Sequence, residues 1–293
     1  MVLQKPFSGG NKIRELRSRL VKQNRSAVSQ GLSGPDTHVV RAVQTMKNVE
    51  SLFNLLYEQT IEWYSLHFPE LKQAVRDPSV QLSMIIRMGS RKDFSAEGLQ
   101  HFFSDETSVS RVVGMVERSS GGDISPSSLK AIQGVARVAL QLKEEQRSLQ
   151  DFVSRQIIEL APNLSSLGTP LIAAQLLGKA GSLKRLAEMP ASTIQVLGSE
   201  EALFSHIKNK TRPPKHGFIF NHPYIKTLPK HARGRMARTL SGKLAICIRM
   251  DVFGKDRIAD AYKPALEALS KKLAKAPFKK AGKKPDFRGK FPH

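Results

Sequence analysis

Several common features are scarce or absent in this 293-residue sequence, and each absence excludes a class of protein. Cys247 is the only cysteine, so neither an intrachain disulfide nor a cysteine-based metal cluster can form. We therefore expect a reducing, cytoplasmic location. No apolar run of about 18 residues is present, and the first residues lack the apolar core of a signal peptide. The sequence predicts no membrane span and no signal segment.

Acidic residues are missing from one long stretch of the chain. Between Glu201 and Asp251 lie 49 residues with eleven Lys or Arg and no Asp or Glu. Residues 161–293 carry a net charge of +18 and residues 1–160 one of +4, out of a total of +22. Lysine or arginine placed on a phosphate releases condensed counterions, so this excess favours a polyanionic partner. Nucleic acid is the leading prediction, an anionic membrane surface is the second, and solubility alone is the third.

Familiar catalytic patterns are also absent. The sequence contains no P-loop, no G-x-G-x-x-G, no H-E-x-x-H and no C-x-x-C. Four histidines fall in the acid-free stretch, at positions 206, 216, 222 and 231, with spacings that do not match a helical metal site. The sequence therefore predicts no catalytic residue, no metal site and no cofactor. A histidine-based nuclease is the enzymatic alternative.

Apolar spacings of three and four residues predict an all-α fold. After a disordered segment at 1–11 we expect a helix over 12–30 and another over 37–68, with Asp36 as its N-cap. Residues 79–118 are expected to form two shorter helices.

A Gly- and Ser-rich turn then leads into a long helix over 127–160, with Ser125 as N-cap and Pro126 at the first helical position. A short turn before a long helix predicts an antiparallel pair, and its seam is either buried in the monomer or binds a second copy. We assign residues 12–160 to a helical and coiled-coil dimerisation region. The apolar residues at these spacings are, in the helix over 37–68, Val39, Val43, Met46, Val49, Leu52 and Leu56 with Phe53 beside them, and in the long helix Leu129, Ile132, Val135, Val138, Leu142, Leu149, Phe152 and Leu160.

Two regions follow the long helix. Residues 161–262 read as a compact helical domain, in which the run 217–223 is too isolated to make a sheet. Residues 263–293 are rich in Lys and are expected to be a disordered basic tail that contacts phosphate without reading sequence.

Glu200 and Glu201 stand immediately before the acid-free stretch. As adjacent helical residues they point about 100° apart, which is unsuited to an acid/base pair. We interpret them as acids in the first turn of a short helix with Ser199 as N-cap, where the helix dipole stabilises negative charge.

The cations that follow predict an RNA-binding surface. One group lies in and after the short helix, where Pro213 and Pro214 stiffen the loop, and a second group begins the next long helix. Imidazoles among these cations suit phosphate contact or base stacking. A solvated charged face is the alternative. The predicted residues are His206, Lys208, Lys210, Arg212, Lys215, His216, Lys230, Arg233, Arg235 and Arg238.

The block from "ELAPNLSSLGTPLIAAQLLGKAGSLKRLAEMPAST" through "GSEEALFSHIKNKTRPPKHGFIFNHP" to "GRMARTLSGKLAICIRMDVF" resembles the Nop domain. This is the RNA- and protein-binding module of the archaeal box C/D ribonucleoprotein core protein. "EWYSLHFPEL" at 62–71 is similar to a second signature of the same family. Together the similarity covers about residues 12–260.

The resemblance implies an all-α fold with an antiparallel coiled-coil arm that forms a homodimer, followed by a globular domain. It also implies a non-catalytic scaffold that binds a box C/D-type kink-turn RNA together with a kink-turn-binding protein of ribosomal type. In this family fibrillarin carries out the methyl transfer. By the same resemblance, RNA contact extends to Gly198, Ala202, Leu203 and Phe204.

Two departures from the family pattern stand out. The similarity begins near Asn11, which leaves no room for the domain that docks fibrillarin, so fibrillarin recruitment is doubtful. A dimeric RNA-binding adaptor that recruits no fibrillarin is the alternative function. The family loop reads G-A-E-K-A-L-F-R, whereas Glu201 and Ser205 stand here in place of its Lys and Arg. RNA contact at those two positions is therefore not expected.

Overall fold

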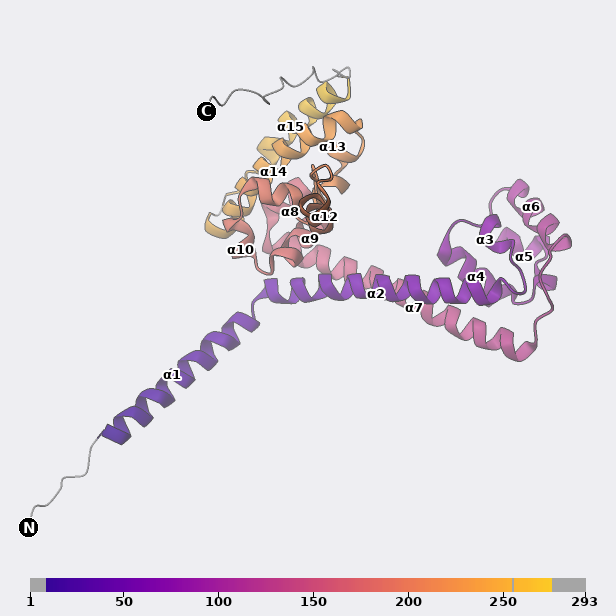
Figure 1. Cartoon of the computed structure of the whole chain (residues 1–293), viewed down its shortest axis with the longest axis horizontal. Coiled ribbons are helices and arrows are strands. Elements are labelled where there is room, and N and C mark those ends of the chain that lie inside the picture. Colours follow the sequence, from indigo (N-terminus) through magenta and orange to yellow (C-terminus); the bar gives the residue numbers. More distant parts are fainter. Residues whose placement is uncertain (1–8, 255, 276–293) are drawn as a thin grey trace, which may run out of the picture. The chain divides into compact units, whose positions relative to one another are not determined.

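The computed structural model describes residues 9–254 and 256–275, and in those residues every regular element is a helix (Figure 1). The predicted all-α fold is confirmed. None of the described helices combines the length and hydrophobicity that a bilayer crossing requires. The chain divides into two compact units, residues 41–153 and residues 1–40 with 154–293. We call them, in that order, the arm unit and the head unit.

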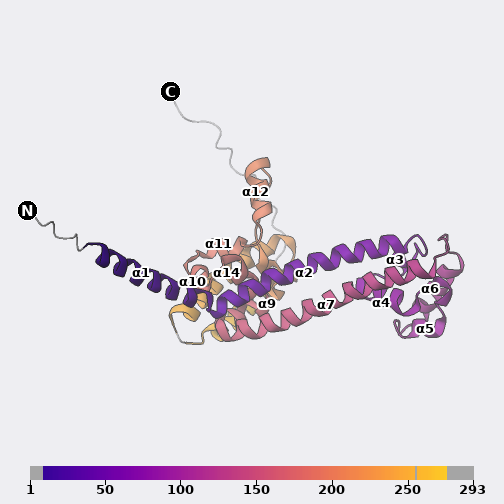
Figure 2. The ribbon, with the colours of Figure 1, turned by 90° about the horizontal axis from the view of Figure 1, so that it is seen from below.

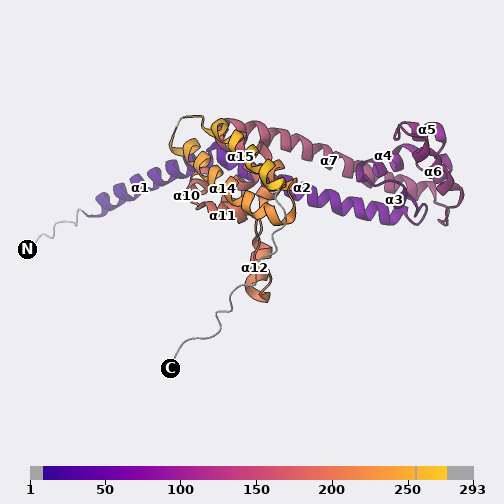
Figure 3. The ribbon, with the colours of Figure 1, turned by 90° about the horizontal axis from the view of Figure 1, so that it is seen from above.

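Two long helices build the arm unit, α2 (Pro35–Tyr64) and α7 (Pro126–Leu160), which lie side by side in Figures 2 and 3. Their seam is buried and contains Phe53, Tyr57 and Ile61 from α2 and Ile132 and Ala136 from α7. The Lys143 ammonium lies 5.0 Å from the centre of the Phe53 ring. The heptad-like spacing of these residues is what keeps one face of each helix on its neighbour.

The antiparallel pair therefore differs from the one expected. The partner of α7 is the 30-residue α2, because α6 (Glu106–Glu117) before the turn has only 12 residues and packs on α3 (Leu71–Ala74) and α5 (Ala96–Gln100). The start of α7 is as predicted, since the Ser125 hydroxyl accepts the Ser128 N–H at 3.1 Å. Three of the apolar residues with helical spacing, Leu52, Val138 and Phe152, are exposed.

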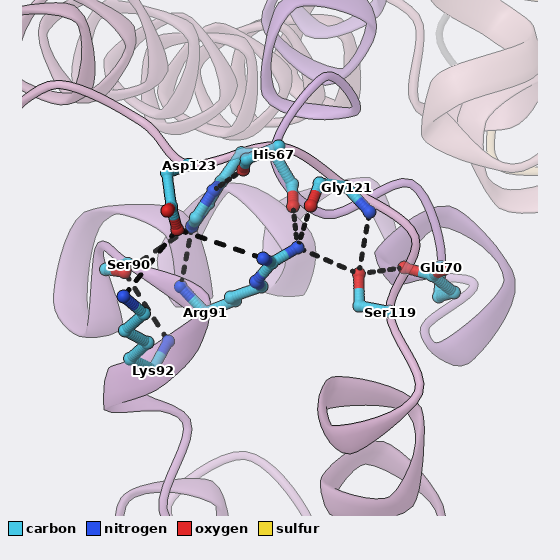
Figure 4. Close-up of polar contacts among 9 residues, drawn as sticks. His67, Glu70, Ser90, Arg91, Lys92, Ser119, Gly121 and Asp123 are labelled. Atoms are coloured by element: carbon cyan, nitrogen blue, oxygen red, sulfur yellow. Dashed lines mark hydrogen bonds and ion pairs between the residues drawn. The ribbon is translucent and has the colours of Figure 1, made fainter.

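The tip of the arm unit holds α3, α4 (Pro78–Met88), a 3-10 turn at Arg91–Asp93, α5 and α6. Figure 4 shows the polar cluster that ties three of its loops together. The buried His67 lies 2.7 Å from the Gly122 carbonyl through Nδ1, and its Nε2 accepts the Arg91 N–H at 2.9 Å. The Arg91 guanidinium donates to the His67 and Gly121 carbonyls, and Glu70 accepts the Ser119 hydroxyl at 2.7 Å. The "LHFPEL" run thus has a structural role.

The head unit is organised around α14 (Lys230–Phe253), which packs against α8 (Pro162–Gly168), α10 (Leu183–Glu188), α11 (Ala191–Val196) and α15 (Ala259–Ala274). Met236, Leu240, Leu244 and Ile248 recur every four residues and form its buried face. The other elements are α9 (Pro170–Ala180), α12 (Glu200–Asn209), a 3-10 turn at Phe218–Asn221 and α13 (Pro223–Lys226).

One buried clamp joins three helices of the head unit. The Asp251 carboxylate accepts the Asn163 and Leu164 N–H groups at 3.0 and 2.8 Å and the Asn163 amide at 2.8 Å. The side-chain amide oxygen of Asn163, Oδ1, in turn accepts the N–H groups of Ile258 and Ala259, at 2.7 and 3.2 Å. Two side chains therefore satisfy the backbone at the beginnings of α8 and α15 and hold both to the end of α14.

Three expectations about the ends of segments need correction. Residues 263–274 belong to α15, because its apolar residues Leu266 and Leu273 are buried, so the predicted tail is not disordered there. The remainder of that tail, 276–293, lies outside the described residues. At the other end α1 (Gly9–Leu32) already includes 9–11 of the segment expected to be disordered, and 1–8 lie outside the described residues. Asp36 lies inside α2, and its carboxylate accepts the Leu183 N–H at 3.3 Å.

Candidate nucleic-acid interface

The helix α12 carries the first group of predicted site residues and projects from the rest of the head unit (Figures 2 and 3). None of its ten residues is buried. Because α12 contributes no buried side chain to the core, packing within the chain does not explain its sequence. Its surface is therefore available to a partner.

The base of α12 is held by two chain segments that run beside each other. Gly217 and Phe218 donate their N–H groups to the carbonyls of Gln195 and Leu197, each at 2.8 Å. A Cβ on Gly217 would lie 1.9 Å from the Leu197 carbonyl oxygen, so only glycine permits this approach. Gly198, with φ of 91°, likewise has no room for a Cβ, which would lie 2.5 Å from the Phe218 ring.

Glu200 fastens the N-terminal end of α12. Its carboxylate accepts the Gly198 N–H at 2.9 Å and forms an ion pair with the Lys179 ammonium at 3.3 Å. Partial burial raises the pKa of this carboxyl, but the Gly198 N–H and the Lys179 ammonium outweigh it and leave the pKa below its usual value. Both glutamates lie in the first turn, as predicted. Ser199 precedes the helix, but its hydroxyl donates to the Val196 carbonyl at 2.6 Å and makes no capping hydrogen bond, so the expected N-cap is wrong.

Beyond Glu200, α12 presents apolar side chains to solvent. Leu203 is 37% exposed, and Phe204 and Ile207 are 68% and 69% exposed. Exposed apolar clusters of this kind usually mark contact sites. Ile207 was not predicted, although its i+3 and i+4 spacing from Phe204 and Leu203 could have identified it. We call Leu203, Phe204 and Ile207 the apolar ridge. Ala202 and Glu201 are exposed beside it.

The cations after α12 are mostly in solvent. Lys208, Lys210, Arg212 and Lys215 are all exposed, and Lys210 ends the helix in the left-handed conformation with φ of 53°. The His206 ring contacts the Thr211 carbonyl, which folds the loop back on the helix end. The loop cations are therefore held by a folded segment of the chain.

His216 and Arg233 are engaged in packing. The His216 ring stacks on Phe220 with centres 4.7 Å apart, and the Arg233 guanidinium lies 5.2 Å from the centre of the same ring. Arg233 Nε also donates to the Leu228 carbonyl at 2.7 Å. Burial lowers the pKa of His216, and the charges of Arg233 and Lys215 lower it further. These two residues hold the loop against the start of α14.

The remaining predicted cations begin α14. Lys230, Arg235 and Arg238 are exposed on its first turns. The loop reaches this helix at Lys215, since a Cβ on Gly234 would lie 3.4 Å from the Lys215 Cδ. The structure thus brings the loop cations and the α14 cations to one part of the head unit.

Features that would support catalysis were also searched for. In the part of the chain that the structure describes, no group of three His, Cys, Asp or Glu side chains is placed to hold a metal ion. His222 is buried, lies 2.9 Å from the Leu167 carbonyl through Nε2 and accepts the Tyr224 N–H at 3.2 Å. Burial raises the pKa of Cys247 to about 12. Both residues are therefore parts of the core.

Comparison with known proteins bears on this surface. A family model named Nop, described as "snoRNA binding domain, fibrillarin", matches residues 45–275. An uncharacterized NOP5 family protein of Methanocaldococcus jannaschii is 38% identical over 238 residues, which cover 81% of this chain and 56% of that protein. Nucleolar protein 58 of Aspergillus terreus is 32% identical over 275 residues, covering 87% of this chain and 48% of that protein.

Two further proteins are similar to this chain. Nucleolar protein 58 of Rattus norvegicus is 32% identical over 222 residues, covering 75% of this chain and 41% of that protein. A chain in a crystal structure of a fibrillarin/Nop5p complex matches with a TM-score of 0.46 and 23% identity, covering 93% of this chain and 87% of that chain. This chain spans about half the length of the curated relatives it matches.

The expected cytoplasmic location is contradicted by these relatives, several of which are nucleolar by name. That prediction was wrong because it rested on cysteine content. A single buried thiol reports on redox conditions, which do not separate the cytoplasm from a nuclear compartment.

Proposed function

This chain belongs to the Nop family, and we propose from that premise that it is a non-catalytic scaffold for a ribonucleoprotein. It binds a kink-turn RNA of the box C/D type together with a kink-turn-binding protein. The observation that carries the proposal is the composition of the surface at α12. An apolar ridge without a partner in the described chain stands beside a loop and a helix start whose charged side chains are all cations.

The two parts of this surface suit two kinds of contact. The exposed cations Lys208, Lys210 and Arg212 gain free energy on a phosphate backbone through counterion release. The apolar ridge gains nothing from phosphate, but it can bury against a protein or stack on an unpaired base. A composite of RNA and protein satisfies both parts, which neither component alone does.

Glu201 and Ser205 limit where the RNA lies. Glu201 is exposed, and a carboxylate repels a phosphate, so the backbone runs along the C-terminal side of α12 and the start of α14. Gly198 and His216 act in this arrangement by holding the loops, and the cations make the contacts.

A gel-shift titration tests the proposal. The chain is mixed with kink-turn RNA, with and without a kink-turn-binding protein, and with scrambled RNA of equal length. We expect selective binding of kink-turn RNA only when the protein is present, and equal binding of the scrambled RNA would refute the proposal. Arg235→Glu should weaken assembly and reduce the salt slope, whereas Arg76→Glu, an equal charge change on an exposed arm-unit residue, should not.

Fibrillarin recruitment needs a separate measurement. Assembled particles carrying this chain are purified and their protein content is quantified. Stoichiometric fibrillarin supports a scaffold for 2′-O-methylation of RNA, in which the partner performs the chemistry. RNA-bound particles without fibrillarin support the alternative function, an adaptor that binds structured RNA.

Dimerisation through the arm belongs to the same proposal. The intramolecular seam leaves Leu52 and Leu55 of α2 and Val138 and Phe152 of α7 exposed, at 40% to 57% of their surface. A second copy would bury these side chains. We expect Leu55→Asp to convert a dimer to a monomer in sedimentation experiments, and a wild-type chain that is monomeric throughout would exclude this interface.

A further inference from the structure

The helix α1 has an apolar face that nothing in the described chain covers. Ile13, Leu16 and Leu20 are 68%, 60% and 51% exposed and recur at the spacing of the a and d positions of a heptad. This helix precedes residues 45–275, to which the family description applies. The proposed function therefore does not account for it.

Cations flank this face on both sides. In the heptad that places Ile13 and Leu20 at a, Arg17 falls at e and Arg19 at g, the positions that face a partner helix. Residues 9–32 contain six Lys or Arg and one acid, Glu15. Among the described residues, neither Arg17 nor Arg19 takes part in an ion pair. Within the described residues, no ion pair neutralises either arginine.

The charge pattern selects among possible occupants. Two copies of α1 would set the arginines of one against the arginines of the other, which disfavours self-association. An RNA backbone would satisfy the cations but leave three large apolar side chains in water. An amphipathic helix with Asp or Glu beside its apolar seam matches both features.

A separate hollow lies at the C-terminal part of α1, on residues that fall at b and f of the same heptad and therefore beside the a and d face. A groove of about 640 Å³ opens there, lined by Val21, Arg25 and Val28 of α1 and by His38 of α2. Asn24, Ser29 and Ser33 also line it, so this hollow is more polar than the face at Ile13, Leu16 and Leu20 and is not part of the proposed site.

We propose that the apolar face of α1 is the binding site for an acidic amphipathic helix of another protein. The seam of that helix packs on Ile13, Leu16 and Leu20, and its flanking carboxylates pair with Arg17 and Arg19. The interaction joins a second protein to the particle through a surface separate from α12.

A designed peptide tests this inference on the full chain. The probe is a fluorescein-labelled helix with Leu at the a and d positions and Glu at e and g, followed by fluorescence anisotropy. We expect saturable binding that Leu16→Glu with Leu20→Glu weakens at least about tenfold. Phe253→Glu, at a residue 68% exposed on α14, is the matched control and should leave the affinity unchanged.

Two further probes separate the pairing from general attraction to a basic protein. A peptide of the same composition with scrambled order should bind at least about tenfold more weakly. A peptide with Lys at e and g should bind poorly to the wild type, and better after Arg17→Glu with Arg19→Glu. Equal binding of the Glu and scrambled peptides would overturn the inference.

The other occupants give distinct results. A concentration-dependent dimer that Leu16→Glu with Leu20→Glu abolishes would replace the inference with self-association. Loss of kink-turn RNA binding in the same variant, with peptide binding unchanged, would assign the face to RNA. Intact RNA assembly with lost peptide binding supports the inference, and this result does not depend on the function of α12.

Discussion

Replacement of Glu200 by alanine should loosen α12 without unfolding the head unit. The carboxylate holds the Gly198 N–H at 2.9 Å and the Lys179 ammonium at 3.3 Å, and it joins the helix to the loop before it and to α9. No residue of α12 is buried, so few other contacts hold the helix in place. The variant should therefore raise the population of an open loop.

The magnitude follows from the two contacts. A hydrogen bond to a charged group contributes roughly 1.5–3 kcal/mol, with the lower end expected here because 35% of the Glu200 side chain is exposed. An exposed ion pair adds about 0.2–1 kcal/mol. Solvent screens both contacts at this partly exposed site, so their combined loss should cost about 1–2 kcal/mol locally, which multiplies the opening equilibrium roughly 5- to 30-fold.

Amide hydrogen exchange measures this opening directly. Exchange at Gly198 and along α12 should accelerate by that factor in Glu200→Ala, while buried amides of α14 keep their wild-type rates. Glu201→Ala is the control, since Glu201 is exposed and has no recorded partner among the described residues. Equal acceleration in both variants, or none in Glu200→Ala, would refute the role assigned to Glu200.

Four other outcomes follow from the structure. The effect of Glu200→Ala should vanish in acid, and hydrogen exchange measured at several pH values would show this. The folded pKa of Glu200 is lowered, so its carboxylate contributes stability above the unfolded pKa near 4.5 and loses that contribution as the pH falls through the folded pKa. Glu201→Lys should tighten kink-turn RNA binding by about 3- to 10-fold and steepen the salt dependence by about one ion in gel-shift titrations. Asn163→Ala should lower the free energy of unfolding by about 3 kcal/mol in urea, because buried N–H groups and the Asp251 carboxylate lose their partner. Thr169→Gly should raise it by about 1 kcal/mol, because Thr169 adopts φ of 73°, where a β-branched side chain is strained.

Local signals in the sequence predicted the helices well. The Ser125–Pro126 pair marked the start of α7 because capping depends on residues three positions apart. The first turns of α12 and α14 were located for the same reason, since charge and proline placement are also local. The RNA-binding role of their cations stays a prediction.

Features set by distant residues were not predictable in this way. The buried face of α2 contains Phe53 and Tyr57, whereas the periodic set ran through Leu52 and Leu56 with Phe53 only beside it, and Leu52 is exposed. Both sets have helical spacing, and only the placement of α7 decides between them. Likewise His216 became part of a stack because Phe220 and Arg233 meet it from other segments.

The two adjacent acids before the basic stretch have different roles because a helix separates their directions. The Glu200 carboxylate contacts the Gly198 N–H and the Lys179 ammonium, and these contacts hold α12 in place. Glu201, about 100° further round the helix, is exposed with its charge uncompensated in the described chain. A carboxylate there costs the fold nothing and repels phosphate from the N-terminal side of the helix. Under the proposed function, loss of RNA contact at that position leaves the helix intact, so that α12 offers its apolar ridge to a protein while the loop cations bind the RNA.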